Sequence, residues 1–240
     1  MPRFTSVLRR PWLGGRRRRA VCRTVCALVL ATAAAHGLAG GGPENVFVVV
    51  NPSSADSLAV ANAFVACRDV PPINIFMLPW KGGGESTSIE VFRREIIAPI
   101  IRAIDARRLS GQIDCIAYSS DFPVRVDFTA ELSPELAKRD TFPSAALTGL
   151  TMLYGALQGG PVSWLDPESN DYYRLPAANG VPDTTLGFRG WYGWGQRGEL
   201  LEAGGTRYLP AVMLGVTSGK ANSVREVAAY LRSSAAADGT

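Results

Sequence analysis

Three apolar runs separated by helix-like segments constrain the fold of this chain more than any other feature. The runs are residues 45–50, 73–78 and 113–118, and charge hardly interrupts them. A continuous apolar run of this length is typical of a strand buried on both faces of a parallel sheet. Parallel neighbours need a crossover connection, which is usually a helix. The order therefore predicts an α/β fold, a mainly parallel sheet with helices on both faces.

The helix-like segments carry recognisable start and stop signals. In residues 55–67 the apolar residues recur at spacings of three and four, and Pro71-Pro72 closes the segment. The second segment begins in residues 86–88, where Thr87 and Glu90 have the spacing of a capping box. Pro99 lies inside the apolar stripe of this second helix, so we expect a kink or a break there.

Residues 124–208 form an irregular insertion rich in glycine and aromatic residues. One helix is expected within it, over residues 145–158, because apolar residues recur there at helical spacing before Gly159-Gly160-Pro161. Regular structure is predicted to return with a strand over residues 208–216. A helix over residues 223–235 should follow, where Ser223 and Glu226 again have capping-box spacing.

The first 39 residues have the three parts of a signal peptide. Seven arginines and no acid precede an apolar stretch that is too short to span a bilayer. Small residues then offer cleavage sites after Ala35 or after Ala39, and residues 40–44 make a linker. We therefore expect residues 45–240 to form one exported domain, located in the periplasm, at the cell surface or outside the cell. An uncut leader that anchors the chain in the membrane is the alternative.

Removal of the leader reverses the charge of the protein. Eight of the 25 basic residues and none of the 21 acidic ones lie in residues 1–39, so the remaining chain has 17 against 21 and a net charge of −4. This balance gives no reason to expect a nucleic-acid partner. The only histidine, His36, leaves with the leader or stays in the linker. Catalysis that needs an imidazole is therefore largely excluded from the domain.

Three loops at predicted strand ends are the candidate ligand site. In an open α/β sheet, ligands bind in the crevice beyond the carboxyl ends of the strands. If the strands are neighbours, these loops converge. An alternative interpretation is that the serines cap helices and the charged side chains are only solvated. The candidate residues are Asn51, Ser53, Ser54, Asp56, Ser119, Ser120, Asp121, Arg125, Ser218, Lys220 and Asn222.

Trp191, Tyr192 and Trp194 form an aromatic cluster with two interpretations: a platform for a sugar or a partner, or a cluster that pins a long loop. Cys67 and Cys115 are each interpreted as a buried thiol or as one half of a disulfide.

We predict no metal site, because Asp166, Glu168, Asp171 and Asp183 lack the spacing of a calcium loop. No nucleotide cofactor is expected either, because residues 215–221 depart from the phosphate-binding loop pattern.

Several segments together resemble a known bacterial family. They are residues 44–51, 56–62, 70–74, 92–97, 121–125, 188–194 and 215–224. The chain is similar to the uncharacterised exported family that co-occurs with exosortase, the membrane enzyme of PEP-CTERM protein sorting. The resemblance covers residues 44–240, and it implies an envelope or extracellular setting but no established reaction. Members of that family continue further, so the resemblance also implies a C-terminally incomplete chain.

The predicted three-layer sheet is Rossmann-like or caspase-like, and its strand order has a fainter likeness to the gingipain-type cysteine peptidases. Two functions follow as hypotheses. The first is a non-catalytic domain that binds a polysaccharide or protein of the cell envelope through its strand-end loops. A purely structural partner in surface-layer assembly shares the same evidence. The rival is a cysteine-peptidase-like hydrolase whose catalytic residues are missing or lie beyond residue 240.

Overall fold

The computed structural model describes residues 42–82, 85–132, 134–137, 143–157, 193–194, 200–201, 208–217 and 222–237. The chain divides into two units, residues 1–39 and residues 40–240. All described residues belong to the second unit.

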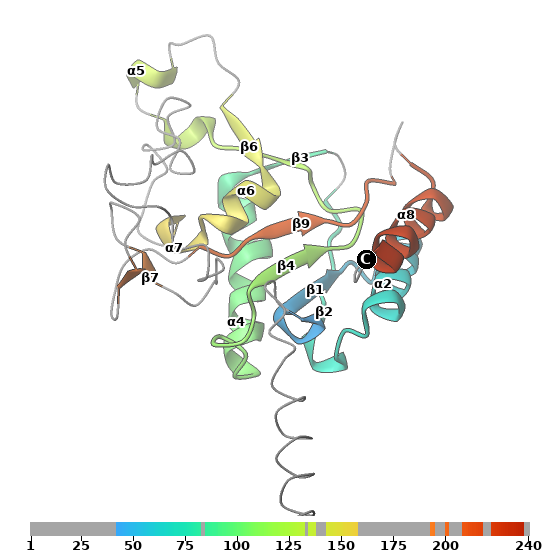
Figure 1. Cartoon of the computed structure of the whole chain (residues 1–240). Helices are drawn as coiled ribbons and strands as arrows, with labels where there is room; N and C mark the ends of the chain where they lie inside the picture. Colours follow the sequence, from blue (N-terminus) through green and yellow to red (C-terminus); the bar gives the residue numbers. More distant parts are fainter. Residues whose placement is uncertain are drawn as a thin grey trace, which may run out of the picture. The chain divides into compact units, whose positions relative to one another are not determined.

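A four-stranded parallel sheet forms the centre of this unit (Figure 1). Its strands are β1 (Val46–Val50), β2 (Ile75–Met77), β4 (Cys115–Tyr118) and β9 (Ala211–Met213), in the order β2-β1-β4-β9. Each pair of neighbours is parallel. The four apolar segments predicted as strands are thus the four strands of the sheet, and the α/β class is confirmed.

Side chains alternate between two helical layers along the central strands. Phe47, Val49, Ile116 and Tyr118 pack toward the segment made of α3 (Ile89–Val91), η3 (Phe92–Ile97) and α4 (Ala98–Ala106). Their neighbours in the strands, Val48, Val50 and Ala117, pack toward α2 (Ala55–Arg68). Both faces of the sheet are therefore covered, which explains why the strand sequences are apolar without interruption.

The last helix, α8 (Val224–Ala237), lies against α2 (Figure 1). Val227 and Leu231 of α8 share a buried cluster with Val60 of α2. The guanidinium of Arg68 adds a hydrogen bond of 3.0 Å to the hydroxyl of Ser234. Ser223 and Glu226 form the predicted capping box: the Glu226 carboxylate accepts from the Ser223 amide at 2.7 Å, and the Ser223 hydroxyl accepts from the Glu226 amide at 3.3 Å.

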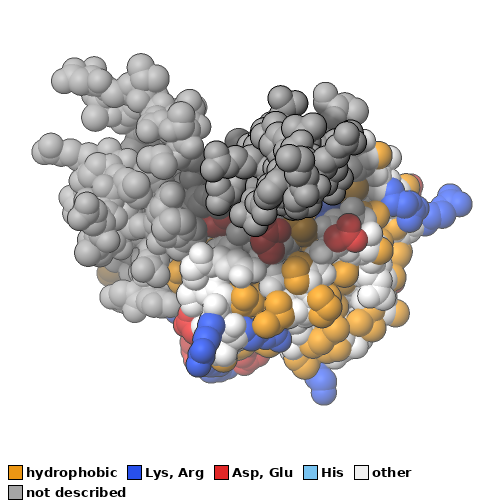
Figure 2. Space-filling view, turned by 60° about the horizontal axis from the view of Figure 1, so that its bottom comes forward, with side chains coloured by type: hydrophobic (Ala, Val, Ile, Leu, Met, Phe, Trp, Pro, Cys, Tyr) orange, Lys and Arg blue, Asp and Glu red, His pale blue; other side chains and the backbone are white. Residues whose placement is uncertain are grey.

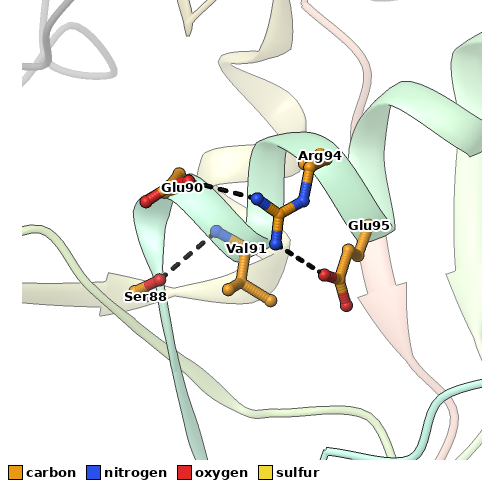
Figure 3. Close-up of polar contacts among 5 residues, drawn as sticks. All are labelled: Ser88, Glu90, Val91, Arg94 and Glu95. Carbon is orange, nitrogen blue, oxygen red and sulfur yellow. Dashed lines mark hydrogen bonds and ion pairs between the residues drawn. The ribbon is translucent and has the colours of Figure 1, made fainter.

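The helix that was predicted to start near Thr87 is capped one residue later. Ser86–Ser88 form strand β3, and the hydroxyl of Ser88 accepts from the amide of Val91 at 3.3 Å (Figure 3). Arg94 then pairs with Glu90 at 3.1 Å and with Glu95 at 2.8 Å. Pairing of β3 with β5 (Arg125–Asp127) fixes Thr87 in a strand, so Thr87 does not act as the cap.

Pro99 widens its helix. Residues 92–97 form a π-helix, in which the Ala98 amide donates to the carbonyl of Arg93, five residues earlier. A proline ring clashes with the carbonyl four residues before it and has no N–H of its own. The wider turn accommodates both effects, and α4 continues to Ala106.

The expected insertion supplies two strands, β5 and β6 (Ser144–Ala146), which pair antiparallel with each other. Together with β3 they form a second sheet of order β3-β5-β6. The prediction of a single helix over residues 145–158 is wrong. Its start belongs to β6, and the remainder is split at Leu153 into α6 (Leu147–Met152) and α7 (Tyr154–Leu157).

The remaining elements are short. They are the 3-10 turns η1 (Pro43–Asn45), η2 (Pro72–Asn74) and η4 (Thr129–Glu131), helix α5 (Pro134–Ala137), and the antiparallel pair β7 (Gly193–Trp194) and β8 (Leu200–Leu201). Across the described residues, no helix is both long and apolar enough to cross a membrane.

Candidate functional site

The candidate site lies where the order of the sheet reverses. β2 pairs with one side of β1, whereas β4 pairs with the other side and continues to β9. The connections that leave β1 and β4 therefore separate at their carboxyl ends, and ligands of open α/β sheets bind at such a point. The loops after β1, β4 and β9 contain three of the segments that the sequence indicated.

Asn51 holds two of these loops and the chain after β2 together. Its side-chain carbonyl accepts from the amides of Ser53 at 3.0 Å and Trp80 at 3.1 Å. Its side-chain amide donates to the carbonyls of Trp80 at 3.0 Å and Asp121 at 3.3 Å. An asparagine side chain has two acceptor and two donor positions, and all four are used. Asn51 is 3% exposed, so it positions the site and has no free group for a ligand.

Two buried serines connect the helix α2 to the end of β4. The hydroxyls of Ser57 and Ser119 are hydrogen-bonded to each other, and the hydroxyl of Ser57 also accepts from the amide of Asn51 at 2.9 Å. Both serines are fully buried. Ser57 was not among the residues singled out from the sequence, because a serine in the first turn of a helix gives no sign of such a partner.

Ser54 and Asp121 form the polar centre of the site. The hydroxyl of Ser54 caps α2 by accepting from the amide of Ser57 at 3.0 Å, and it donates to Oδ2 of Asp121. Asp121 has a left-handed backbone with a φ of 58°, which is uncommon for a residue other than glycine. This carboxylate therefore lies at the amino end of α2, where the helix dipole favours negative charge.

The second oxygen of the same carboxylate is enclosed. Oδ1 of Asp121 is buried and has no hydrogen-bond partner among the described residues, although the Asp121 side chain as a whole is half-buried. An enclosed acceptor without a donor costs about 1 to 3 kcal/mol. A hydrogen-bond donor that reaches this oxygen would recover this cost.

Ser120 and Thr217 extend the polar group to the loop after β9. The hydroxyl of Thr217 donates to that of Ser120 at 3.2 Å. Ser120 is buried, and Leu214, which follows β9, donates its amide to the carbonyl of Tyr118 at 2.8 Å. The three loops thus meet through side-chain contacts, as the strand-end prediction requires.

The other candidate residues lie in these loops, in α2, in the second sheet or outside the described residues. Arg125 is exposed on β5 in the second sheet, where its guanidinium lies 3.5 Å from the carboxylate of Glu85. Asp56 is half-buried in the first turn of α2, whereas Ser53 and Asn222 are exposed. Ser218, Lys220, Trp191 and Tyr192 lie outside the described residues, and so does the acidic loop of residues 166–183. Of Trp194 only its place in β7 is described.

Both described cysteines are free thiols. Cys115 is at the start of β4, where burial, together with the neighbouring carboxylate of Asp114, raises the pKa of its thiol to about 11. Such a thiol is almost entirely protonated at neutral pH, and the thiolate is the nucleophilic form. Cys115 is therefore unsuited to covalent catalysis.

No set of three His, Cys, Asp or Glu side chains in the described part of the chain is close enough to hold a metal ion. Comparisons with protein-family models, with curated proteins and with solved structures found no match for this chain. The chemistry of the strand-end site is therefore the basis for a functional assignment.

Proposed function

We propose that this chain is an exported binding domain that takes a hydroxyl-rich ligand, such as a polysaccharide of the cell envelope, at the loops after β1, β4 and β9. The leader of residues 1–39 supports export. The observation that carries the binding proposal is the Asp121 carboxylate: one oxygen is bonded to Ser54, and the other is enclosed without a donor from the described residues.

The donors and acceptors of the site favour a sugar. Each hydroxyl of a sugar both donates and accepts a hydrogen bond. The site offers the half-buried Asp121 carboxylate as an acceptor and the half-buried hydroxyl of Thr217, which can do both. Hydrogen bonds to a charged acceptor contribute about 1.5 to 3 kcal/mol, more than those between neutral groups. Asp121 is therefore expected to contribute most to affinity.

Binding suits the site better than nucleophilic catalysis. The hydroxyl of Ser54 is engaged as a helix cap and as a donor to Asp121, so its oxygen is held in a structural role. The thiol of Cys115 has a raised pKa and lies at the beginning of β4, the end of the strand opposite to the site.

The test is retention on isolated bacterial envelopes from which proteins have been removed. We expect the wild-type protein to co-sediment with them, and Asp121→Asn to bind about 10- to 100-fold more weakly because the charged acceptor is lost. Asp105→Asn, a matched change at the end of α4, should bind like the wild type. Equal retention of both variants, with both folded by circular dichroism, would contradict the proposal.

A further inference from the structure

A cavity of about 260 Å³ is lined by residues of η3, α4 and α7. Ile97 and Leu157 form buried parts of its wall, and Ile101 and Tyr154 are half-buried beside them. None of the residues around this cavity belongs to the strand-end site. The lining residues are Arg93, Ile97, Ala98, Ile101, Tyr154 and Leu157.

The π-helix η3 and the residue after it form one wall of the cavity. The wide turn is closed by the bond from the Ala98 amide to the Arg93 carbonyl, and both residues line the cavity together with Ile97. A π-turn within an α-helix is rare and is found frequently at functional sites. Ala98 carries only a methyl group, so a larger side chain at this position would fill part of the space.

The side chains around the cavity favour an uncharged ligand. Five of the six are apolar or aromatic, and the sixth, Arg93, forms an ion pair with the carboxylate of Glu131. The side chains of this pair are 25% and 19% exposed. A charged ligand would lose its hydration here and would meet a cation that is already neutralised. An uncharged, mainly apolar molecule has no such cost.

Two of the lining groups favour an aromatic ring over an alkyl group. A guanidinium such as that of Arg93 is attracted to the face of an aromatic ring. The ring of Tyr154 can pack against a second ring edge-to-face or with an offset. An apolar cavity of about 150 Å³ is enough to hold benzene. The larger volume here leaves room for a ring with several substituent atoms or for two fused rings.

We propose that this cavity binds a small, uncharged aromatic compound. The aliphatic side chains of Ile97, Ile101 and Leu157 enclose the ring, and Arg93 remains paired with Glu131 while its guanidinium contacts the π-electrons. The proposal goes beyond the binding of an envelope ligand and is independent of it, because the two sites share no residue.

Apolar side chains on the open surface serve as a comparison. Hydrophobic side chains gather on the side of the molecule where β2 and the end of α4 lie (Figures 1 and 2). In the β2 segment, Ile73 is 53% exposed and Met77 is 50% exposed. A ring on such a surface stays in contact with water and gains less than a ring enclosed by several side chains. The methyl groups of Ile73 and Met77 therefore report non-specific binding.

The test follows the methyl signals of 13C-labelled isoleucine, leucine and methionine in the exported protein while phenol is added. We expect saturable shifts at Ile97, Ile101 and Leu157, with a dissociation constant of about 1 mM or below, and none at Ile73 or Met77. Cyclohexanol has the same ring size and one hydroxyl but no π-electrons. It should bind about two- to fivefold more weakly, because the cation–π attraction is lost.

Variants that fill the cavity test where the ligand lies. Ala98→Leu should weaken the binding of phenol at least about tenfold. Ala106→Leu, the same change at the exposed end of α4, should leave it unchanged. If Ala98→Leu does not fold, Ile101→Phe places a ring of the protein itself in the cavity and should have the same effect. The proposal is overturned by the absence of saturable shifts in the wild type, by equal binding of cyclohexanol, or by phenol binding that persists in a folded variant with a filled cavity.

Discussion

At the scale of single residues, Asn51 does most to position the strand-end loops. Replacing it by alanine removes four hydrogen bonds and leaves buried backbone groups of Trp80 without partners. We expect the free energy of unfolding to fall by about 2 to 4 kcal/mol, because buried polar groups lose their only bonds. Urea unfolding measures this change.

Asn62→Ala is the control for Asn51→Ala. Asn62 is exposed on α2, so its removal should change the free energy of unfolding by less than about 0.5 kcal/mol. Equal effects of the two substitutions would mean that Asn51 does not hold the loops together.

The thiol of Cys115 should react slowly with an alkylating reagent. Its pKa is raised to about 11 from an ordinary value of 9.0, so far less thiolate is present at pH 8 than in an unfolded chain. In a Cys67→Ser background, iodoacetamide should modify folded Cys115 about 100-fold more slowly than the urea-unfolded protein. The rate should rise as the pH approaches 11. Equal rates in the two states would contradict the predicted burial.

At the scale of elements, Ser54 caps α2 and also joins it to the loop after β4. Ser54→Ala should lower the free energy of unfolding by about 1 to 2 kcal/mol, because the cap and the bond to Asp121 are lost together. Ser88→Ala removes a longer, exposed cap bond at the start of α3 and should cost less, about 1 kcal/mol or below. Thermal unfolding of both variants checks this order, and the reverse order would contradict the link to Asp121.

The helices show which local signals can be interpreted correctly from the sequence alone. The capping box at Ser223 is formed as predicted, because α8 begins without competition from a strand. The same spacing at Thr87 gave a wrong prediction. Thr87 lies in β3, which pairs with β5, and Ser88 is the residue that caps the helix. Pro99 was recognised as a disturbance, but the choice of a π-helix depends on how the whole segment packs.

At the scale of the whole molecule, the sheet and the meeting of its loops followed from the sequence, because buried parallel strands have an apolar signature and their carboxyl ends share one edge. The roles of individual residues did not follow from the sequence. Arg125 was predicted at the site but lies on β5, because the chain after Asp121 turns into a second sheet. Ser57 was missed because its partner, Ser119, is distant in the sequence.

Export is a further prediction at this scale. We expect the protein recovered from an exporting bacterial host to begin after Ala35 or Ala39, with a net charge of −4 for the chain that follows residue 39. Intact mass and N-terminal sequencing identify the new terminus. A full-length chain that stays in the membrane fraction would instead support an uncut anchor.

The central claim is that the loops after β1, β4 and β9 bind a hydroxyl-rich envelope ligand through Asp121. The most direct test is to titrate the 15N-labelled protein with polysaccharide fragments released from bacterial envelopes and to follow the backbone amide signals. We expect shifts at Ser54, Ser120, Asp121 and Thr217, and their loss in Asp121→Asn. Shifts confined to other surfaces, such as the edge of β2, or shifts that persist in Asp121→Asn, would contradict the account.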